Sequence, residues 1–380
     1  MSDSFQQVEE TLRSGGASAG FDLLTQKFRE EKNYPLLFEA RLMQKRHELG
    51  LPLIQSVSSD ELPEDKRRAY DEGFIGAARE VGSLFLADGN IPRAWPYLRA
   101  IGETASVAAA IESFSAPEGD NEKLDPVIEI AFHERVHPRR GFELILANYG
   151  ICRAITFFDQ YPDRKTREDS AALLVRTLHG ELVESLKRSI ARAEGQAPET
   201  RRISELIAGR EWLFGEYAYY VDTSHLVSIL RFSVDLTDRE TLALAAEMTD
   251  YGKQLSSQFQ YKGEPPFENI FEDYGIFLRA LIGENVDEGV AHFQRKASEI
   301  DPAEAGPGPA QVLVGLLARL RRYPEAIEAS LKYLRDVSPS ELVCPTVMQL
   351  CEMAGDRERL KDLARERGDL LSFAAGALSA

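Results

Sequence analysis

The segment REVGSLFLADGNIPRAWPYLRAIG, residues 79–102, decides the fold of this chain. Its apolar residues recur at intervals of three and four on both sides of the triplet Asp88-Gly89-Asn90, which is a typical turn sequence. These apolar positions are Val81, Phe85, Ala94, Leu98 and Ile101. Because such spacing is typical of amphipathic helices, the segment predicts two helices joined by a short turn.

The details of this segment resemble the tetratricopeptide repeat. Val81-Gly82 stands where that family has Leu-Gly, and Phe85 stands where it has its first Tyr. Gly89 lies in the turn, and Ala94 and Leu98 take the places of the family's Ala and Phe, although the first Trp of the pattern is absent. A second copy is found at residues 312–339, and a looser third copy at residues 274–302. The resemblance implies pairs of helices that stack on their neighbours.

Helical patterns also dominate the rest of the chain, and the alternating pattern of strands is almost absent. The middle is helical too but departs from the repeat, with helices predicted at 126–137, 167–194, 204–220 and 223–232, and a terminal helix pair at 345–353 and 357–367. We therefore predict an all-α fold, a right-handed superhelix of antiparallel helical hairpins with a concave surface, as in tetratricopeptide-like α-solenoids.

Three regions follow from this pattern. Residues 1–123 form an N-terminal helical-repeat region, residues 124–260 form the atypical central region, and residues 261–380 form the C-terminal repeats and cap. The central region contains four of the six histidines, so we expect a functional site there.

Composition excludes several classes of protein. Lys and Arg number 45 against 62 Asp and Glu, which leaves a net charge of −17 and argues against a general nucleic-acid binder or an anionic membrane surface as partner. No apolar run approaches the ~20 residues of a membrane span, and no basic, apolar leader is visible, so we expect a cytoplasmic protein. The three cysteines, Cys152, Cys344 and Cys351, are too few for a disulfide framework and are interpreted as reduced core residues.

Residues 132–137 read FHERVH and contain the pattern HExxH. On a helix, His133 and His137 would point at one metal ion while Glu134 handles a metal-bound water. The motif resembles that of zinc metallopeptidases, and this resemblance implies a divalent metal such as zinc and Glu134 as catalytic residue. The context differs from that family, because Arg135 is charged and Pro138 ends the predicted helix directly after the motif.

A second arrangement on the same predicted helix is the series Glu129, His133 and His137, at i, i+4 and i+8. These three side chains would share one helix face, whereas Glu134 would be rotated away from it. The face is either a set of metal or substrate ligands or a hydrogen-bonded, solvated polar stripe, and the sequence leaves both interpretations open.

Residues 217–225, YAYYVDTSH, form a second polar cluster. Asp222 and His225 are three residues apart and could complete a metal site. Asp222 is equally suited to cap the following helix, and His225 to be a hydrogen-bonded core residue. Tyr217 and Tyr220 either pack between helices or line a small-molecule or peptide groove.

Two further residues are candidates for that groove. Arg139 could recognise a carboxylate or phosphate, or simply interact with a helix dipole. His179 could join the cavity from its own helix. No GxGxxG, P-loop, GxSxG or EF-hand sequence is present, which disfavours nucleotide-dependent enzymes.

Two functions are compatible with these patterns. In the first, the central region carries a His/carboxylate metal site with hydrolytic chemistry. In the second, the chain is a non-catalytic scaffold for protein–protein interaction that holds a peptide, protein or small molecule in a concave groove. The sequence does not separate them.

Overall fold

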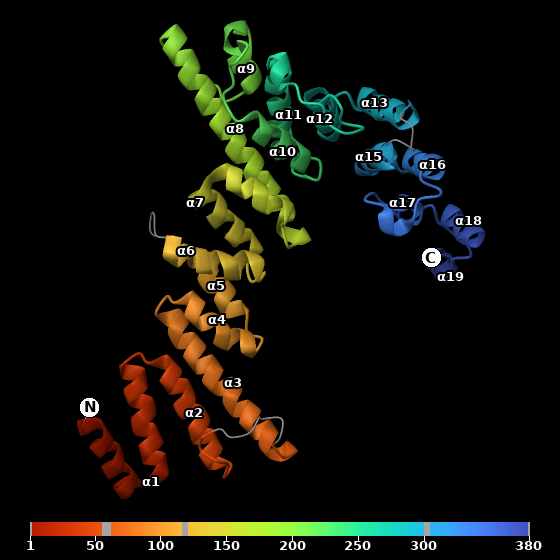
Figure 1. The fold of residues 1–380 in the computed structure, drawn as a ribbon. Coiled ribbons are helices and arrows are strands. Elements are labelled where there is room, and N and C mark those ends of the chain that lie inside the picture. Colours follow the sequence, from red (N-terminus) through yellow and green to blue (C-terminus); the bar gives the residue numbers. More distant parts are fainter. Residues whose placement is uncertain (1, 55–61, 116–120, 300–304, 379–380) are drawn as a thin grey trace. The chain divides into compact units, whose positions relative to one another are not determined.

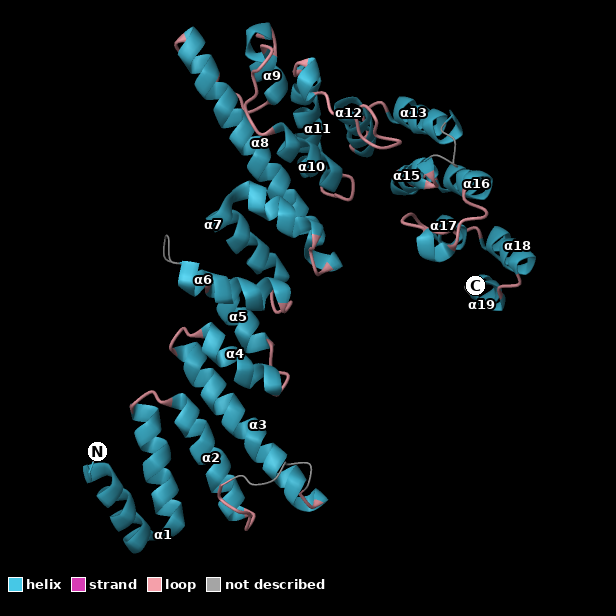
Figure 2. Ribbon diagram, viewed as in Figure 1, coloured by secondary structure: helices cyan, strands magenta, loops and turns pink. Residues whose placement is uncertain are grey.

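The computed structural model in Figure 1 describes residues 2–54, 62–115, 121–299 and 305–378. Within these ranges the regular elements are helices, and Figure 2 shows no strand among them. A single antiparallel bridge between Lys262 and Asn269 is the only strand-like pairing in the described part of the chain. The prediction of an all-α fold is confirmed.

The chain divides into two compact units. The first contains residues 1–150 and 160–166, and the second contains residues 151–159 and 167–380. The division falls inside one long helical segment at Gly150, whose φ of 77° interrupts the helix. The three-region division expected from the sequence stays a prediction.

The first unit is built from consecutive helices that pack on one another, α1 on α2, α2 on α3, α3 on α4 and α4 on α5. Its helices are α1 (Ser2–Glu30), α2 (Tyr34–Glu48), α3 (Glu64–Ala87), α4 (Ile91–Ala100), α5 (Ala105–Ser113), α6 (Asn121–Ile128), a π-helical turn η2 (Glu129–His133) and the first part of α7 (Pro138–Asp159).

The second unit continues the same packing of neighbours, with α11 on α12, α12 on α13, α13 on α15 and α15 on α16. Apart from short 3₁₀ turns, its helices are the second part of α7, most of α8 (Arg164–Glu194), α9 (Ile203–Ile207), α10 (Thr223–Ser233), α11 (Arg239–Gln254), α12 (Ile270–Leu281), α13 (Val286–Glu299), α15 (Gly308–Arg319), α16 (Tyr323–Tyr333), α17 (Val347–Ala354), α18 (Arg357–Arg367) and α19 (Leu370–Leu378). Stacked neighbouring helices are compatible with a helical solenoid.

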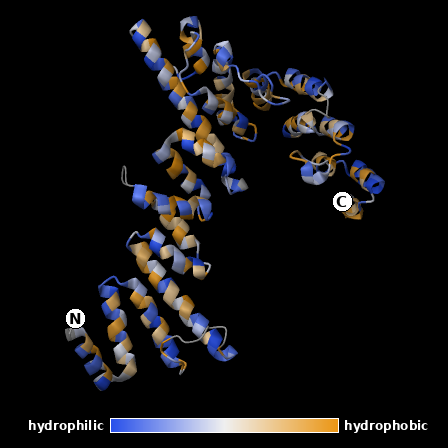
Figure 3. Ribbon diagram, viewed as in Figure 1, coloured by the Kyte–Doolittle hydropathy of each residue, from blue (hydrophilic) through white to orange (hydrophobic). Residues whose placement is uncertain are grey.

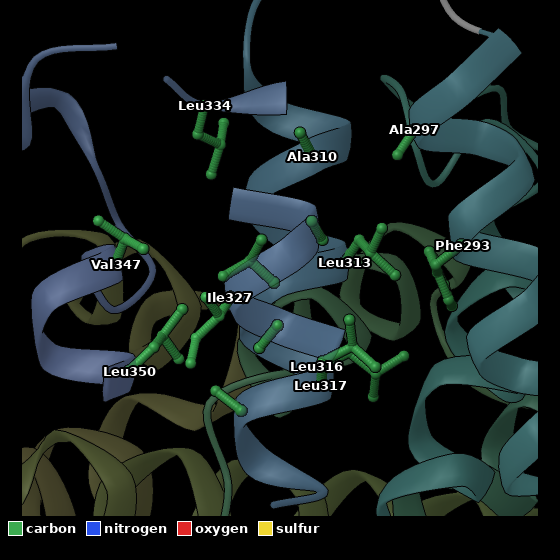
Figure 4. Packing of buried hydrophobic residues seen from close by; sticks show 14 of the residues in the cluster. Phe293, Ala297, Ala310, Leu313, Leu316, Leu317, Ile327, Leu334, Val347 and Leu350 are labelled. Carbon is green, nitrogen blue, oxygen red and sulfur yellow. The ribbon is translucent and has the colours of Figure 1, made fainter. Parts of the chain in front are cut away.

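The hydrophobic core runs between neighbouring helices because most helices carry both apolar and polar residues, which Figure 3 shows along the ribbon. In the second unit one continuous cluster joins α13, α15, α16 and α17 (Figure 4). Phe293, Leu316 and Leu350 from three of these helices are fully buried in it. Each helix is therefore stabilised by the next one along the chain.

The segment 79–102 forms the two predicted helices, α3 and α4, with the turn at the predicted place. Gly89 has a φ of 73°, which glycine adopts without strain, and the Asn90 side chain caps α4 by accepting from the Arg93 N–H at 3.2 Å. A Cβ on Gly82 would lie 2.5 Å from Cγ of Leu98, so the close approach of α3 and α4 requires glycine there.

Other local predictions need correction. The helix predicted at 126–137 is wrong beyond His133, because α6 is followed by a π-helical turn that ends at this residue and Arg135 has a φ of 63°. The helix predicted at 204–220 is wrong beyond Ile207, since Gly209 has a φ of 67°. Cys152 is exposed and not a core residue. The end of the third repeat copy, at Pro302, lies outside the described residues.

None of the helices in the described ranges is long and apolar enough to cross a membrane. The cytoplasmic location stays a prediction.

The contact between Gly82 and Leu98 generates the first prediction. Gly82→Val should destabilise the chain by about 1–3 kcal/mol, because the added methyl groups overpack the α3–α4 contact. Gly76→Val is a matched control in the same helix, since a Cβ at Gly76 meets nothing within 4 Å. The free energy of unfolding in urea measures both variants, and equal effects of the two substitutions would contradict the packing argument.

Candidate functional site

The HExxH segment forms a tightly packed joint in the first unit. Phe132 is buried, and its ring centroid lies 5.5 Å from that of Tyr161 and 5.3 Å from that of His133. A Cβ on Gly141, in α7, would lie 2.9 Å from the Phe132 backbone nitrogen. The beginning of α7 is therefore pressed directly against the π-helical turn. The continuous α-helix that would align Glu129, His133 and His137 on one face is not formed, and Glu129 and His133 are both exposed.

Glu134 forms an ion pair with α4. Its Oε2 lies 2.6 Å from Nη1 of Arg99. The carboxylate is partly exposed and Arg99 is largely exposed, so this pair contributes less than ~1 kcal/mol to stability. In this structure the predicted catalytic carboxylate connects the HExxH segment to a neighbouring helix.

His137 caps the next helix. Its carbonyl accepts from the Gly141 N–H at 3.0 Å, and its Nδ1 accepts a longer hydrogen bond of 3.4 Å from the Arg140 N–H. Pro138 is then the first residue of α7, where its missing N–H costs nothing. The other ring nitrogen, Nε2, lies 3.1 Å from Oε2 of Glu112 in α5. Both ring nitrogens of His137 thus have protein partners.

Arg139 is part of the same connection between α5 and α7. It forms ion pairs with Glu112 at 2.9 Å and with Glu143 at 2.5 Å. Arg140 adds a pair with Glu143 at 2.9 Å and donates to the Phe114 carbonyl at 2.8 Å. The charge of Arg139, predicted to contact a ligand, is shared between two carboxylates of its own unit.

The second polar cluster belongs to the second unit. Asp222 caps α10, since its Oδ1 accepts from the Ser224 N–H at 2.8 Å and from the Ser224 hydroxyl at 2.6 Å. The pKa of Asp222 lies below its usual value, chiefly because the Ser224 hydroxyl donates a hydrogen bond to its carboxylate. Partial burial acts in the opposite direction, while the backbone N–H groups and His225 lower the pKa further. His225 is half-buried in the first turn of α10. Burial raises the pKa of Glu181, and the nearby His225 partly offsets this increase. The capping interpretation of Asp222 is confirmed.

His179 is buried and has a structural partner. Its Nε2 lies 3.3 Å from Oε2 of Glu247, and the same carboxylate oxygen accepts from the Ile203 N–H at 3.0 Å. Burial by itself would raise the pKa of Glu247, but these hydrogen bonds bring it below its usual value. His179 therefore helps to hold α8, α9 and α11 together.

The tyrosine-rich segment is not helical. The backbone N–H of Tyr220 donates to the hydroxyl of Tyr251 at 2.9 Å, and the side chain of Tyr220 is half-buried. Tyr217, in contrast, is 74% exposed. Two neighbours that the sequence analysis did not single out as site residues, Trp212 and Tyr219, are exposed as well. The glycines at 209 and 215 that flank Trp212 were the available signal that a helix would be interrupted here.

The metal hypothesis stays a prediction. In the part of the chain that the structure describes, no group of three or more His, Cys, Asp or Glu side chains is placed to hold a metal ion. The expected convergence of His133 and His137 with His225 joins residues of two different units and is not tested. The same holds for the hydrolytic role of Glu134.

Comparisons with known proteins add no assignment: no protein-family model, no curated protein and no solved structure matches this chain.

The capping role of His137 leads to the second prediction. His137→Ala should lower the free energy of unfolding by about 1 kcal/mol, whereas His137→Asn should retain most of it, because an Asn side-chain oxygen can accept the same backbone hydrogen bond. Urea unfolding of the three proteins tests this. A stoichiometric zinc ion in the untagged chain that His137→Asn loses would instead support the metal hypothesis.

Proposed function

We propose that this protein is a non-catalytic α-solenoid scaffold, a right-handed superhelix of antiparallel hairpins, that binds a polypeptide partner. The binding surface we propose is the segment 209–222 of the second unit, called here the aromatic segment. The observation that carries the proposal is the exposure of three large aromatic side chains on it: Tyr217 is 74%, Tyr219 57% and Trp212 48% exposed.

The aromatic segment is held in place by its neighbours. Ser256 Oγ donates to the Glu216 carbonyl at 2.7 Å, and the Gln258 side chain donates to the same oxygen. Leu213 is fully buried, and the ring of Tyr219 contacts that of Phe259 at 5.5 Å. A segment ordered before binding loses less conformational entropy when a partner binds.

Exposed aromatic residues are the side chains that most often dominate the energetics of protein interfaces. Trp and Tyr bury large areas, lose little rotamer entropy and keep a polar atom for hydrogen bonding. Acidic side chains accompany them, since Glu211 and Glu216 are exposed on the same segment. We therefore expect a partner segment that combines apolar and basic residues, with Lys or Arg able to lie over the aromatic rings.

The geometry of the HExxH residues favours this function over hydrolysis. Glu134 pairs with Arg99, and His137 caps α7 and contacts Glu112. The two residues that catalysis would need, Glu134 and His137, thus already have partners in the fold. The exposed aromatic side chains remain available to a binding partner.

The third prediction tests this surface. A displayed library of random peptides should yield binders rich in Lys, Arg and apolar residues, and the triple variant Trp212→Ala, Tyr217→Ala, Tyr219→Ala should bind them about 30-fold or more weakly, which corresponds to ~2 kcal/mol. Binding is measured by titration calorimetry.

Phe5→Ala is the control, since Phe5 is an equally exposed aromatic residue of the first unit. Peptides that bind the triple variant as tightly as the natural chain would contradict the proposal. Circular dichroism of the triple variant shows whether the fold is retained.

A further inference from the structure

A polar cavity of about 510 Å³ lies among α11, α12 and α13 in the second unit. Each helix contributes one polar face to it: Asp250 and Lys253 from α11, Arg279 from α12, and Glu288 and His292 from α13. This cavity is separate from the aromatic segment, and the inference drawn from it does not rest on the proposed function.

Gly275 gives the cavity its depth. A Cβ at this position would lie 2.7 Å from Thr249 Oγ1, 3.3 Å from Lys253 Nζ and 3.4 Å from Arg279 Nη1. The absence of a side chain at Gly275 therefore leaves room for the Lys253 ammonium and the Arg279 guanidinium at the cavity. The Thr249 hydroxyl is fully buried, donates to the Ala246 carbonyl at 2.6 Å and does not line the cavity. Polar atoms gathered in this way favour a polar ligand over an apolar one.

Arg279 has hydrogen-bonding capacity left over. Its Nη2 donates to Oδ2 of Asp250 at 2.5 Å, but its buried Nη1 has no acceptor among the described residues. A buried donor without an acceptor is unfavourable, so an oxyanion that reaches the guanidinium after a small rotation would recover part of this cost. A quarter of the Arg279 side chain is exposed, which leaves it accessible.

A hydrogen bond to Asp273 fixes the position of the His292 ring. Its Nε2 lies 2.7 Å from Oδ1 of Asp273, a fully buried carboxylate. The other oxygen of Asp273 accepts from Lys296 at 2.9 Å and from the Asn269 N–H at 2.8 Å. Because Asp273 occupies Nε2, the ring nitrogen of His292 that remains for a ligand is Nδ1.

The remaining charged side chains of the lining are the exposed cation Arg295 and two carboxylates. Glu272 and Glu288 are exposed at the cavity and have no ion-pair partner in the described part of the chain. A ligand with only one charge would be attracted by one set of side chains and repelled by the other, whereas a ligand with both charges matches both sets.

We propose that this cavity binds a free amino acid in its zwitterionic form. Its carboxylate would lie against Arg279 and Lys253, and its ammonium group would lie against Glu272 and Glu288. His292 contributes a further polar contact from α13.

The experiment uses the full chain and the twenty L-amino acids as separate probes. At least one should raise the midpoint of thermal unfolding in a concentration-dependent way, because a ligand that binds only the folded state stabilises it. The N-acetyl and the carboxamide forms of that amino acid each lack one charge and should bind about tenfold or more weakly by calorimetry.

Variants locate the site. Lys253→Met and Glu288→Gln should each weaken binding about tenfold. Gly275→Val should abolish it, because a side chain there would collide with Thr249 and displace Lys253 and Arg279. Lys165→Met, which removes an exposed charge outside the cavity, should leave affinity unchanged. The first two substitutions are on partly or fully exposed side chains, so they keep the test valid even where Gly275→Val does not fold.

Three results would overturn the proposal: no binding by any of the twenty amino acids, equal binding of the capped forms, or tighter binding of inorganic phosphate than of any amino acid. The last result would identify a site for a simple oxyanion.

Discussion

Close contact between consecutive helices is the constraint on which the rest of this structure depends. At several of these contacts a glycine lies where any side chain would collide with the next helix: a Cβ on Gly82 would lie 2.5 Å from Leu98, and one on Gly252 would lie 2.2 Å from Phe271. Helices this close bury most of their apolar faces, and burial of such faces is the main source of stability in a stack whose elements contact mainly their neighbours. The polar faces are then left for ion pairs and for ligands.

Features that depend on neighbouring residues could be predicted from the sequence. The α3–α4 and α15–α16 pairs were identified because apolar spacing, a turn and the next apolar series are all contained in fewer than 30 residues. The HExxH segment could not be predicted in the same way, because its shape depends on α7 packing at Gly141 against Phe132. Pro138 was interpreted as ending one helix, although it begins the next one.

The candidate site residues also differ in whether their partners lie nearby in the sequence or far from them. Asp222 was recognised as a possible cap because its partner, Ser224, is two residues away. His292 was not among the candidate residues, since nothing in the sequence around it indicates a partner. Its partner Asp273 lies 19 residues earlier, on another helix, and only the packing of α12 and α13 brings the two together. A local sequence pattern cannot predict long-range pairs of this kind.

The role of each charged residue depends on whether its side chain already has an ion-pair or hydrogen-bond partner. In the first unit, Arg99, Glu112 and Arg139 form pairs with the residues around the HExxH motif, so the most enzyme-like sequence in the chain is used to connect helices. In the α11–α13 cavity, Glu272 and Glu288 have no ion-pair partner within the described residues, and one nitrogen of Arg279 has no acceptor there. Charges that already have partners stabilise the fold and would have to break those contacts to bind anything else, which costs free energy. Charges without partners, here those of Glu272 and Glu288, carry no such cost, whereas Arg279 pairs with Asp250 at 2.5 Å and with Glu284 at 3.7 Å, and Lys253 lies 4.0 Å from Asp250. For this reason the α11–α13 cavity is a stronger candidate for small-molecule recognition than the motif that first draws attention in the sequence.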